Sequence, residues 1–342
     1  MSTVPSRPAP PGLGPHCVGL RVVVRRVLPG ERGPTGGPAM TDLLGVMESW
    51  DSVSTVVRAE DGTAMRIALA DIVSGKPVPP RPSPRMRISA EDLCRLSNAS
   101  WPAVHTRPLG DWLLRASGGF SARASSVMAT GDPGVPFEEA LRVVTDFSAD
   151  HGQAPWAQVV VGSSPEERFD RAGWGPARPG EADTELQLAS VAQAARAVRR
   201  MLPRDVPAVE VRDRLTPQWL ADDARALAHH DAAVAVLEGP ADIGFASVPA
   251  DDGAAVVARG RVAVHGDWAG VTDVWVSPAR RRRGLGVAVL AALLERAAEH
   301  GASTVYLQVR ADNAPALALY GTLGFRLHHT YRYLAAAGSS PG

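Results

Sequence analysis

Apolar and polar residues alternate in short runs over the first quarter of the chain. The runs VGLRVVVRRVL, TDLLGVMESW, VSTVVRAEDG and TAMRIAL fall between residues 18 and 69. A period of two indicates strands, and turn formers such as Pro29-Gly30 and Asp61-Gly62 separate the runs. Strands this short and closely spaced predict a small antiparallel barrel of SH3-like type over residues 17–78.

Proline then replaces the apolar pattern. Five prolines stand between Pro77 and Arg85, so we expect an extended linker over residues 79–86 and a domain boundary there. Residues 1–16 lack the long apolar run of a signal peptide and are expected to form a disordered tail. A second short tail is expected over residues 338–342.

Between residues 87 and 190 the order reads helix, strand, strand, helix, strand, helix, strand. The runs WLLRA, ARASSVMAT, WAQVVV and TELQLA are predicted strands, and FEEALRVVTDFSADHG has Leu141, Val144 and Phe147 at helical spacing. This alternation predicts an α/β domain. Residues 191–204 read as a linker helix.

The remaining domain is expected over residues 205–337. It opens with strand AVEVR and helix TPQWLADDARALAHH, where Thr216 is a suitable cap, and continues with strands around IGFASV, AVVARGRVAV and VTDVWVS. From Leu285 the pattern is helical up to a stop at Gly301. Strand TVYLQVR and helix NAPALALYGTLGF follow.

The turn between VTDVWVSP and the helix has the spacing Arg281-x-x-Gly284-x-Gly286. Glycines remove side chains where a backbone approaches a ligand, and a helix N-terminus presents unpaired N–H groups. The pattern therefore favours an anion site, with pyrophosphate as the fitting group. Four consecutive arginines, Arg280 to Arg283, add charge to this turn.

Composition narrows the classes of partner. Lys plus Arg and Asp plus Glu are both 36, so no net charge draws the chain to nucleic acid or to anionic membranes. Cys17 and Cys94 are the only cysteines and do not have metal-ligand spacing. We therefore expect a cytoplasmic protein with no metal and no membrane partner, and nucleic acid is not indicated.

Two motifs in register resemble the GCN5-related N-acetyltransferases. Val276 to Gly286 is similar to their acyl-CoA motif V-x-P-x-x-R-x-x-G-x-G, and Asn313, Tyr320 and Gly324-Phe325 match their N-x-x-A-x-x-x-Y-x-x-x-G-F signature. The resemblance covers roughly residues 209–334. The whole chain resembles three-part actinobacterial acetyltransferases in which a small barrel precedes the transferase.

The resemblance implies acetyl-CoA as cosubstrate and a mixed sheet that splays between VTDVWVS and TVYLQVR to admit the pantetheine arm. It implies that Tyr320 is the general acid that protonates the departing thiolate. The residues it assigns to the cosubstrate are Val274, Trp275, Val276, Arg281, Arg282, Arg283, Gly284, Leu285, Gly286, Val287 and Asn313.

No residue is available as general base at the positions where many relatives carry Glu. Those positions hold Val274, Thr272 and Gly270 in this chain. Asp273 is the nearest carboxylate, although strand parity points it away from Val274. His265, Asp267 and Glu238 are alternatives, and the assignment stays open.

The middle domain repeats the carboxy-terminal part of the last one. SSVMATG aligns with TDVWVSP, and the interval from Met128 to Val159 is close to that from Val276 to Val309. TGDPGVP replaces the glycine motif, and Phe169 stands where Tyr320 does. We therefore expect a degenerate GNAT-like domain followed by a catalytic one.

The expected function is transfer of an acetyl group from acetyl-CoA to a primary amine by direct attack in a ternary complex. The acceptor amine belongs to a protein lysine, a protein N-terminus or a small molecule. The alternative is a non-catalytic acyl-CoA-binding regulatory module whose barrel recognises a protein or nucleic acid. The missing Glu favours the alternative, and the presence of Tyr320 favours the enzyme.

Overall fold

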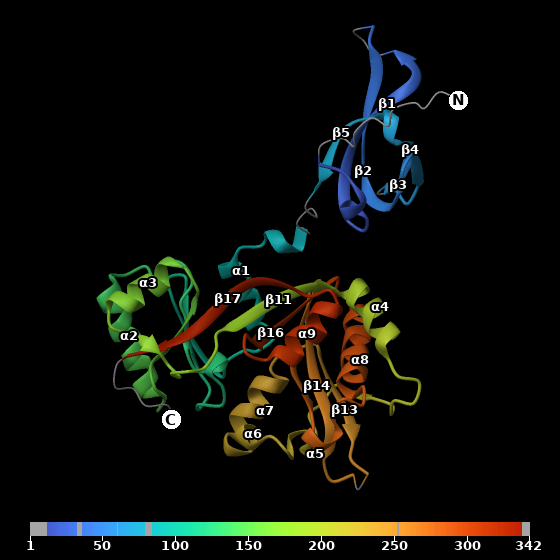
Figure 1. The fold of residues 1–342 in the computed structure, drawn as a ribbon. Helices are drawn as coiled ribbons and strands as arrows, with labels where there is room; N and C mark the ends of the chain where they lie inside the picture. Colours follow the sequence, from blue (N-terminus) through green and yellow to red (C-terminus); the bar gives the residue numbers. More distant parts are fainter. Residues whose placement is uncertain (1–11, 33–35, 60, 79–83, 252, 337–342) are drawn as a thin grey trace. The chain divides into compact units, whose positions relative to one another are not determined.

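The structure is a computed structural model that describes residues 12–32, 36–59, 61–78, 84–251 and 253–336 (Figure 1). The chain divides into two compact units, residues 1–83 and 84–342. Most of the predicted linker and tails lies outside the described residues. The boundary expected between residues 190 and 205 falls inside the second unit.

The first unit is an antiparallel sheet of five strands in the order β4-β3-β2-β1-β5. Its core holds Val22, Val24, Met47 and Val57 on alternating positions of the strands, as the period of two predicts. The bounds are β1 Arg21–Arg32, β2 Pro38–Trp50, β3 Ser54–Ala59, β4 Ala64–Ala68 and β5 Ile72–Pro77.

The amino-terminal tail is shorter than the sequence suggested, as far as the described residues show. Leu13 is buried in the core of the first unit, and a 3-10 turn over Pro15–Cys17 buries Cys17 beside it. A buried leucine contributes about 1.5–3 kcal/mol to stability, which offsets part of the entropy lost when the segment around it is ordered.

The second unit contains one mixed sheet that runs through both predicted domains. Its strand order is β12-β13-β14-β15-β16-β11-β17-β9-β8-β7-β6, with β10 beside β17. The strands are β6 His105–Leu109, β7 Trp112–Ala116, β8 Val127–Met128, β9 Trp156–Val160, β10 Gly175–Pro176, β11 Thr184–Ser190, β12 Glu210–Arg212, β13 Ile243–Pro249, β14 Val256–His265, β15 Trp268–Val276, β16 Thr304–Arg310 and β17 Arg326–Ala335.

The helices of this unit follow the predicted order with one difference. The helix expected over TPQWLADDARALAHH is three pieces, because Thr216, Asp223 and His229 each start a new N-terminus. The helices are α1 Ala90–Asn98, α2 Phe137–Asp150, α3 Ser164–Arg171, α4 Val191–Met201, α5 Pro217–Leu220, α6 Ala224–Ala228, α7 His230–Glu238, α8 Leu285–Glu299 and α9 Ala314–Thr322.

The strand order on one side of the sheet's centre mirrors the order on the other side. Strands β13-β14-β15-β16 correspond to β6-β7-β8-β9, and β12 has no counterpart. We call residues 84–190 the first half and 191–336 the second half. The last strand of each half leaves its own half: β11 pairs with β16, and β17 pairs with β9. The two exchanged strands also pair with each other, and they run side by side across the middle of the unit (Figure 1). The exchange joins the halves into one sheet.

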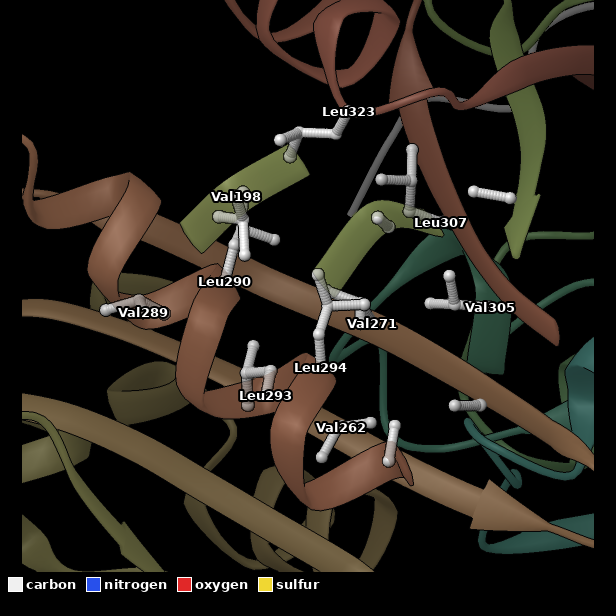
Figure 2. Packing of buried hydrophobic residues seen from close by; sticks show 14 of the residues in the cluster. Val198, Val262, Val271, Val289, Leu290, Leu293, Leu294, Val305, Leu307 and Leu323 are labelled. Carbon is white, nitrogen blue, oxygen red and sulfur yellow. The ribbon is translucent and has the colours of Figure 1, made fainter. Parts of the chain in front are cut away.

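The core of the second half lies between this sheet and helices α4 and α8. Leu290, Leu293 and Leu294 of α8 pack against Val262 and Val271 of the sheet (Figure 2). Val198 of α4 enters the same core, so the segment expected to be a linker helix is part of the packed structure. The buried faces fix α8 against β15, which positions the loop between them.

Candidate active site

The second half contains a split in the sheet at the predicted place. The parallel ladder between β15 and β16 ends at the pair Val271 and Leu307, and the residues beyond it are not paired across the two strands. On its other side β15 stays paired with β14 as far as Val276. The free edge of β15 therefore faces a gap in which an extended chain can add as a strand.

A bulge lies at the start of the split. Arg259 opposes Trp275 and Arg261 opposes Thr272, so Asp273 and Val274 together oppose Gly260. Asp273 has a positive φ of 50°, which is uncommon for a residue other than glycine. Both residues line the cavity in the split, but their side chains have different neighbours. Val274 packs against the core beneath α8, whereas Asp273 Oδ1 lies 3.4 Å from Arg225, which agrees with the expectation that Asp273 points away from Val274.

The cavity in the split has a volume of about 190 Å³. It is lined on one strand by Val271 to Val274 and on the other by Leu307 to Arg310. Tyr320 and Asn313 of the following helix close one side. We call this cavity the thioester slot, after the group that the sequence motifs predict there.

Tyr320 is held rigidly in the thioester slot. Its side chain is 8% exposed, and its ring lies 5.6 Å from that of Phe325. Burial raises the pKa of Tyr320 to about 12, so the phenol keeps its proton at neutral pH. A buried neutral phenol is a proton donor. Asn313 also stabilises the start of α9. Its Oδ1 accepts a hydrogen bond from Ala316 N at 3.3 Å and so caps the helix.

The loop after β15 leads into the N-terminus of α8, as the glycine pattern predicts. Gly284 is the N-cap with φ 81°, and a side chain on it would also collide with the ring of Pro203. This glycine is thus required by the protein itself. Gly286 is different, because a Cβ there would meet only Val276 Cγ2 at 3.6 Å. Nothing in the described chain forbids a side chain at Gly286, so its place in the turn leaves room for close approach of a ligand.

The arginines of this loop are exposed and surround the helix N-terminus. Arg280 forms an ion pair with Asp251 at 2.7 Å, whereas Arg281 Nε donates to Val276 O at 3.3 Å. Arg282 has a positive φ of 59°. Leu285 is buried in the core, and Trp275 packs its ring under the guanidinium of Arg259, so these two offer a ligand only their backbone.

A second, larger cavity of about 470 Å³ shares Thr272, Asp273, Gln308 and Arg310 with the thioester slot. We call it the acceptor cavity. Its walls come from both halves: residues 119–123 and Thr184 belong to the first half, whereas Arg225, Tyr331 and Tyr333 belong to the second. The strand exchange is what brings these walls together.

Charged side chains line the acceptor cavity unevenly. Its arginines are Arg123, Arg178, Arg225 and Arg310, and Asp273 is its carboxylate. Asp273 Oδ1 lies 3.4 Å from Arg225, whereas Asp273 Oδ2 is buried and has no hydrogen-bond partner in the described chain. A buried carboxylate oxygen without a donor is costly, and a ligand ammonium would satisfy it.

The alternative bases do not line either cavity. His265 Nδ1 lies 3.3 Å from Ser100 Oγ, and burial lowers the pKa of His265. Glu238 accepts a hydrogen bond from Leu215 N at 2.8 Å, and Asp267 accepts one from Ser303 at 3.4 Å. All three have structural partners, which leaves Asp273 as the carboxylate at the junction of the cavities.

The structure also explains why position 270 carries no side chain. A Cβ on Gly270 would lie 2.5 Å from Ser100 Oγ and 2.6 Å from Tyr306 Oη. These two hydroxyls are hydrogen-bonded to each other at 2.6 Å. The place where many relatives carry a Glu side chain is therefore filled by a buried Ser–Tyr pair.

Sequence patterns did not single out most residues of the acceptor cavity. Gln308, Tyr331 and Arg225 carry no motif, and Arg123 lies more than a hundred residues from the transferase motifs. Tyr331 Oη donates to Gln308 Oε1 at 2.6 Å, which orients both side chains at the cavity wall. The sequence signal for Arg123 was its place in the degenerate repeat, because such a repeat can supply one wall of a substrate cleft, with Trp112, Arg115 and Arg123 as candidates to face it.

Family models match most of the chain. One described as "Probable histone acetyltransferase Rv0428c C-terminal" covers residues 92–334, and one described as "Rv0428c N-terminal Sm-like domain" covers residues 16–76. The second match agrees with a small barrel-like unit and describes it as Sm-like, whereas the sequence suggested an SH3-like type.

Individual relatives are acetyltransferases by name. A mycothiol acetyltransferase of Clavibacter michiganensis subsp. michiganensis is 35% identical over 59% of this chain and 72% of the relative. A similar protein of Clavibacter sepedonicus is 40% identical, but the match spans only 41% of this chain and half of that relative. The probable histone acetyltransferase Rv0428c of Mycobacterium tuberculosis is 28% identical over 95% of this chain and 96% of its own length.

Solved structures of similar chains include a GCN5-related N-acetyltransferase from Kribbella flavida. It is 20% identical and covers 72% of this chain and 95% of its own, with a TM-score of 0.48. No helix within the described residues is long and apolar enough to cross a membrane. The same part of the chain contains no cluster of three or more potential metal-binding side chains.

Proposed function

The chain belongs to the GCN5-related N-acetyltransferases, and on that premise we propose that it transfers the acetyl group of acetyl-CoA to a primary amine bound in the acceptor cavity. The observation that carries the proposal is the junction of the two cavities. The thioester slot and the acceptor cavity meet at Thr272 and Asp273, so that an acyl donor and an amine have separate entrances and one meeting point.

The donor's pantetheine arm would add to the free edge of β15 through the backbone of Val274 to Val276. The bulge supports this geometry, because the extra residue of a bulge leaves its N–H outside the ladder and free for a carbonyl oxygen. Its pyrophosphate would lie on the first N–H groups of α8, from Leu285 to Val287. Gly286 fits this assignment, since its missing side chain has no cause within the protein.

The acceptor amine would arrive as an ammonium and pair with Asp273 Oδ2. Transfer of one proton from the ammonium to this carboxylate leaves the neutral amine, whose lone pair attacks the thioester carbonyl carbon. The new C–N bond and the negative charge on the carbonyl oxygen form together. An amide N–H at the bulge stabilises that oxygen.

Collapse of this adduct breaks the C–S bond and releases the CoA thiolate. Tyr320 would donate its phenolic proton to that sulfur, and its pKa near 12 keeps the proton available until the sulfur carries charge. The nitrogen loses its second proton to the Tyr320 phenolate through solvent, Asp273 releases its proton to solvent, and the products are the N-acetylated amine and CoA thiol. Asp273 at the junction and Tyr320 in the thioester slot would thus each return to their starting state.

The test is release of CoA thiol from acetyl-CoA in the presence of a panel of amines that includes polyamines, amino acids and basic peptides. We expect amine-dependent release with one thiol per N-acetyl group formed. Binding of acetyl-CoA is measured separately by calorimetry. If acetyl-CoA binds and no amine gives release, the chain is an acyl-CoA-binding module and the proposal is wrong.

A further inference from the structure

The arginines of the acceptor cavity differ in how their charges are compensated. Arg225 lies 3.4 Å from Asp273 and 3.7 Å from Asp223. Arg178 pairs with Glu181 at 3.3 Å, and Arg310 pairs with Glu181 and with Asp312, both at 2.6 Å. Each of these three guanidiniums therefore has at least one carboxylate.

Arg123 is the exception within the described chain. It forms no ion pair with a described carboxylate, and its Nε is buried without a hydrogen-bond acceptor. Its guanidinium lies 5.1 Å from the centre of the Trp101 ring, whose indole N–H is fixed by a 3.0 Å hydrogen bond to Ser121 Oγ. The cation is thus held against an aromatic ring without an ion-paired carboxylate in the described chain, and Asp273 acts on its charge only from a distance.

A guanidinium in this position stays charged. Burial lowers the pKa of Arg123, but the neighbouring Tyr331, Tyr333 and Asp273 raise it, and the net direction is upward. Arg123 is half-buried, and a partly desolvated charge without an ion pair is costly, so a ligand that brings an anion would offset part of that cost. The acceptor cavity therefore has an unfilled place for an anion at Arg123 and an unfilled place for a cation at Asp273 Oδ2.

We infer that the acceptor is a small amine that also carries a carboxylate, with the ammonium paired to Asp273 and the carboxylate paired to Arg123. This rests on the proposed function, because it names the acceptor of that same site. The volume of about 470 Å³ lies in the range of small-molecule sites. Trp101 and Phe120, stacked at 5.9 Å between their centroids, are almost fully buried behind the cavity wall and hold that wall in place.

The same charges disfavour the lysine of a basic protein tail. Arg123 is the guanidinium of the cavity that forms no ion pair within the described chain, so further cations that accompany an attacking lysine would meet its charge at close range. A carboxylate on the acceptor removes this repulsion. The two classes of acceptor therefore predict opposite responses when the charge of Arg123 is removed.

The experiment compares matched amines and matched arginine variants. The amines are a series of amino carboxylates of increasing chain length, the corresponding amino alcohols, the corresponding diamines and a lysine-rich peptide. The variants are Arg123→Gln, Arg123→Lys and Arg168→Gln. Arg168 is the control, since its guanidinium also stacks on an aromatic ring, at 4.4 Å from the centre of Phe137, but lies outside both cavities.

We expect the best amino carboxylate to exceed its amino alcohol by about tenfold or more in kcat/KM, since a charge-assisted hydrogen bond provides a difference of that order. Arg123→Gln should abolish the preference by raising KM, Arg123→Lys should restore part of it, and Arg168→Gln should leave it unchanged. A preference for alcohols, diamines or the peptide overturns the inference, and so does a carboxylate preference that survives in Arg123→Gln.

Product binding separates this inference from the proposed function. N-acetylated amino carboxylates and the matching N-acetylated amino alcohols are titrated into the complex with CoA, and dissociation constants are measured by calorimetry. The carboxylates should bind about tenfold more tightly to the wild type and equally with the alcohols to Arg123→Gln. Equal binding to the wild type overturns the anion site even where turnover occurs. Selective binding without any turnover keeps the anion site and overturns the transferase.

Discussion

The two halves of the second unit have the same order of elements, but only one of them opens. In the second half the ladder between β15 and β16 stops at Val271 and Leu307. In the first half the corresponding strands β8 and β9 pair at Val127 with Ala157 and again at Met128 with Gln158. Ala129 N then donates to Gln158 O at 3.0 Å, so the strands remain closed where their counterparts diverge.

Side chains reinforce this difference. Arg115 lies buried in the first half and donates to Ser126 O, to Ser126 Oγ and to Gln158 Oε1 at 2.9, 3.1 and 2.7 Å. Phe169, the counterpart of Tyr320, is fully buried and stacks on Trp112 at 5.4 Å. The fold alone therefore does not make an acyl-CoA site. A break in the ladder, a bulge and a proton donor in the gap are needed in addition.

The largest expected effect concerns the two aromatic counterparts. Tyr320→Phe should lower kcat by roughly 10²–10⁴-fold, because the departing sulfur loses its proton donor. The dissociation constant of acetyl-CoA should change little. Stopped assays of CoA release and calorimetric titration measure the two quantities.

The matched variant is Phe169→Tyr, which should add no activity and should destabilise the fold, because a hydroxyl is then buried among Trp112, Phe137 and Trp174. Equal activity of Tyr320→Phe and wild type would remove Tyr320 from the mechanism.

The second effect is on stability and concerns the closed strands. Arg115→Met should lower the free energy of unfolding by about 2–4 kcal/mol, because Gln158 and Ser126 lose a buried donor. Burial lowers the pKa of Arg115 only to about 10, so the charge is present at neutral pH. Denaturant unfolding gives the free energy.

Acetyl-CoA should still bind at one molecule per chain in this variant, since the β8–β9 ladder keeps the first half closed. A stoichiometry of two, in the variant or the wild type, would contradict the contrast between the halves.

A third, smaller effect distinguishes the glycines. Gly286→Ala should weaken acetyl-CoA binding by about tenfold while leaving the free energy of unfolding unchanged or slightly higher, since alanine favours a helix by roughly 0.5–1 kcal/mol over glycine. The control is Gly175→Ala in the first half, where a Cβ also has open space. Calorimetry and thermal unfolding check both variants. Unchanged acetyl-CoA binding in Gly286→Ala would show that no ligand approaches this turn closely.

The last prediction is that kcat does not change with pH through the ionisation of Tyr320. Because burial raises the pKa of Tyr320 to about 12, its proton should stay in place throughout the range used for assays, and kcat should show no alkaline decline from this residue up to about pH 10. The free energy of unfolding, by contrast, does depend on pH in the alkaline range. The contribution of Tyr320 is fully present below pH 10, where the phenol is protonated in both states, and it is lost as the pH rises from 10 toward 12, because the unfolded chain then releases the proton more readily. An alkaline limb in kcat below pH 10 that Tyr320→Phe abolishes would contradict this.

The family and the mixed α/β fold were both predicted from the sequence and are confirmed. The reason is local: helical spacing in α8, alternation in β15 and the glycines between them each depend on residues a few positions apart. The assignment of individual site residues stays a prediction, since it rests on the resemblance and on the proposed chemistry. The bulge at Asp273 was not predicted, because alternation of apolar and polar residues carries no signal for a register shift at a single position.

The sequence by itself determined the strand, turn and helix to which we assign the anion site, together with a tyrosine in the next helix. Tertiary structure alone decided that the last strands of the two halves change places, and that Arg123 thereby faces the same cavity as Asp273. The physical reason is the distance along the chain over which each interaction acts. Propensity and periodicity act between near neighbours, whereas the walls of the acceptor cavity come from segments that meet only because buried strand pairing joins the halves.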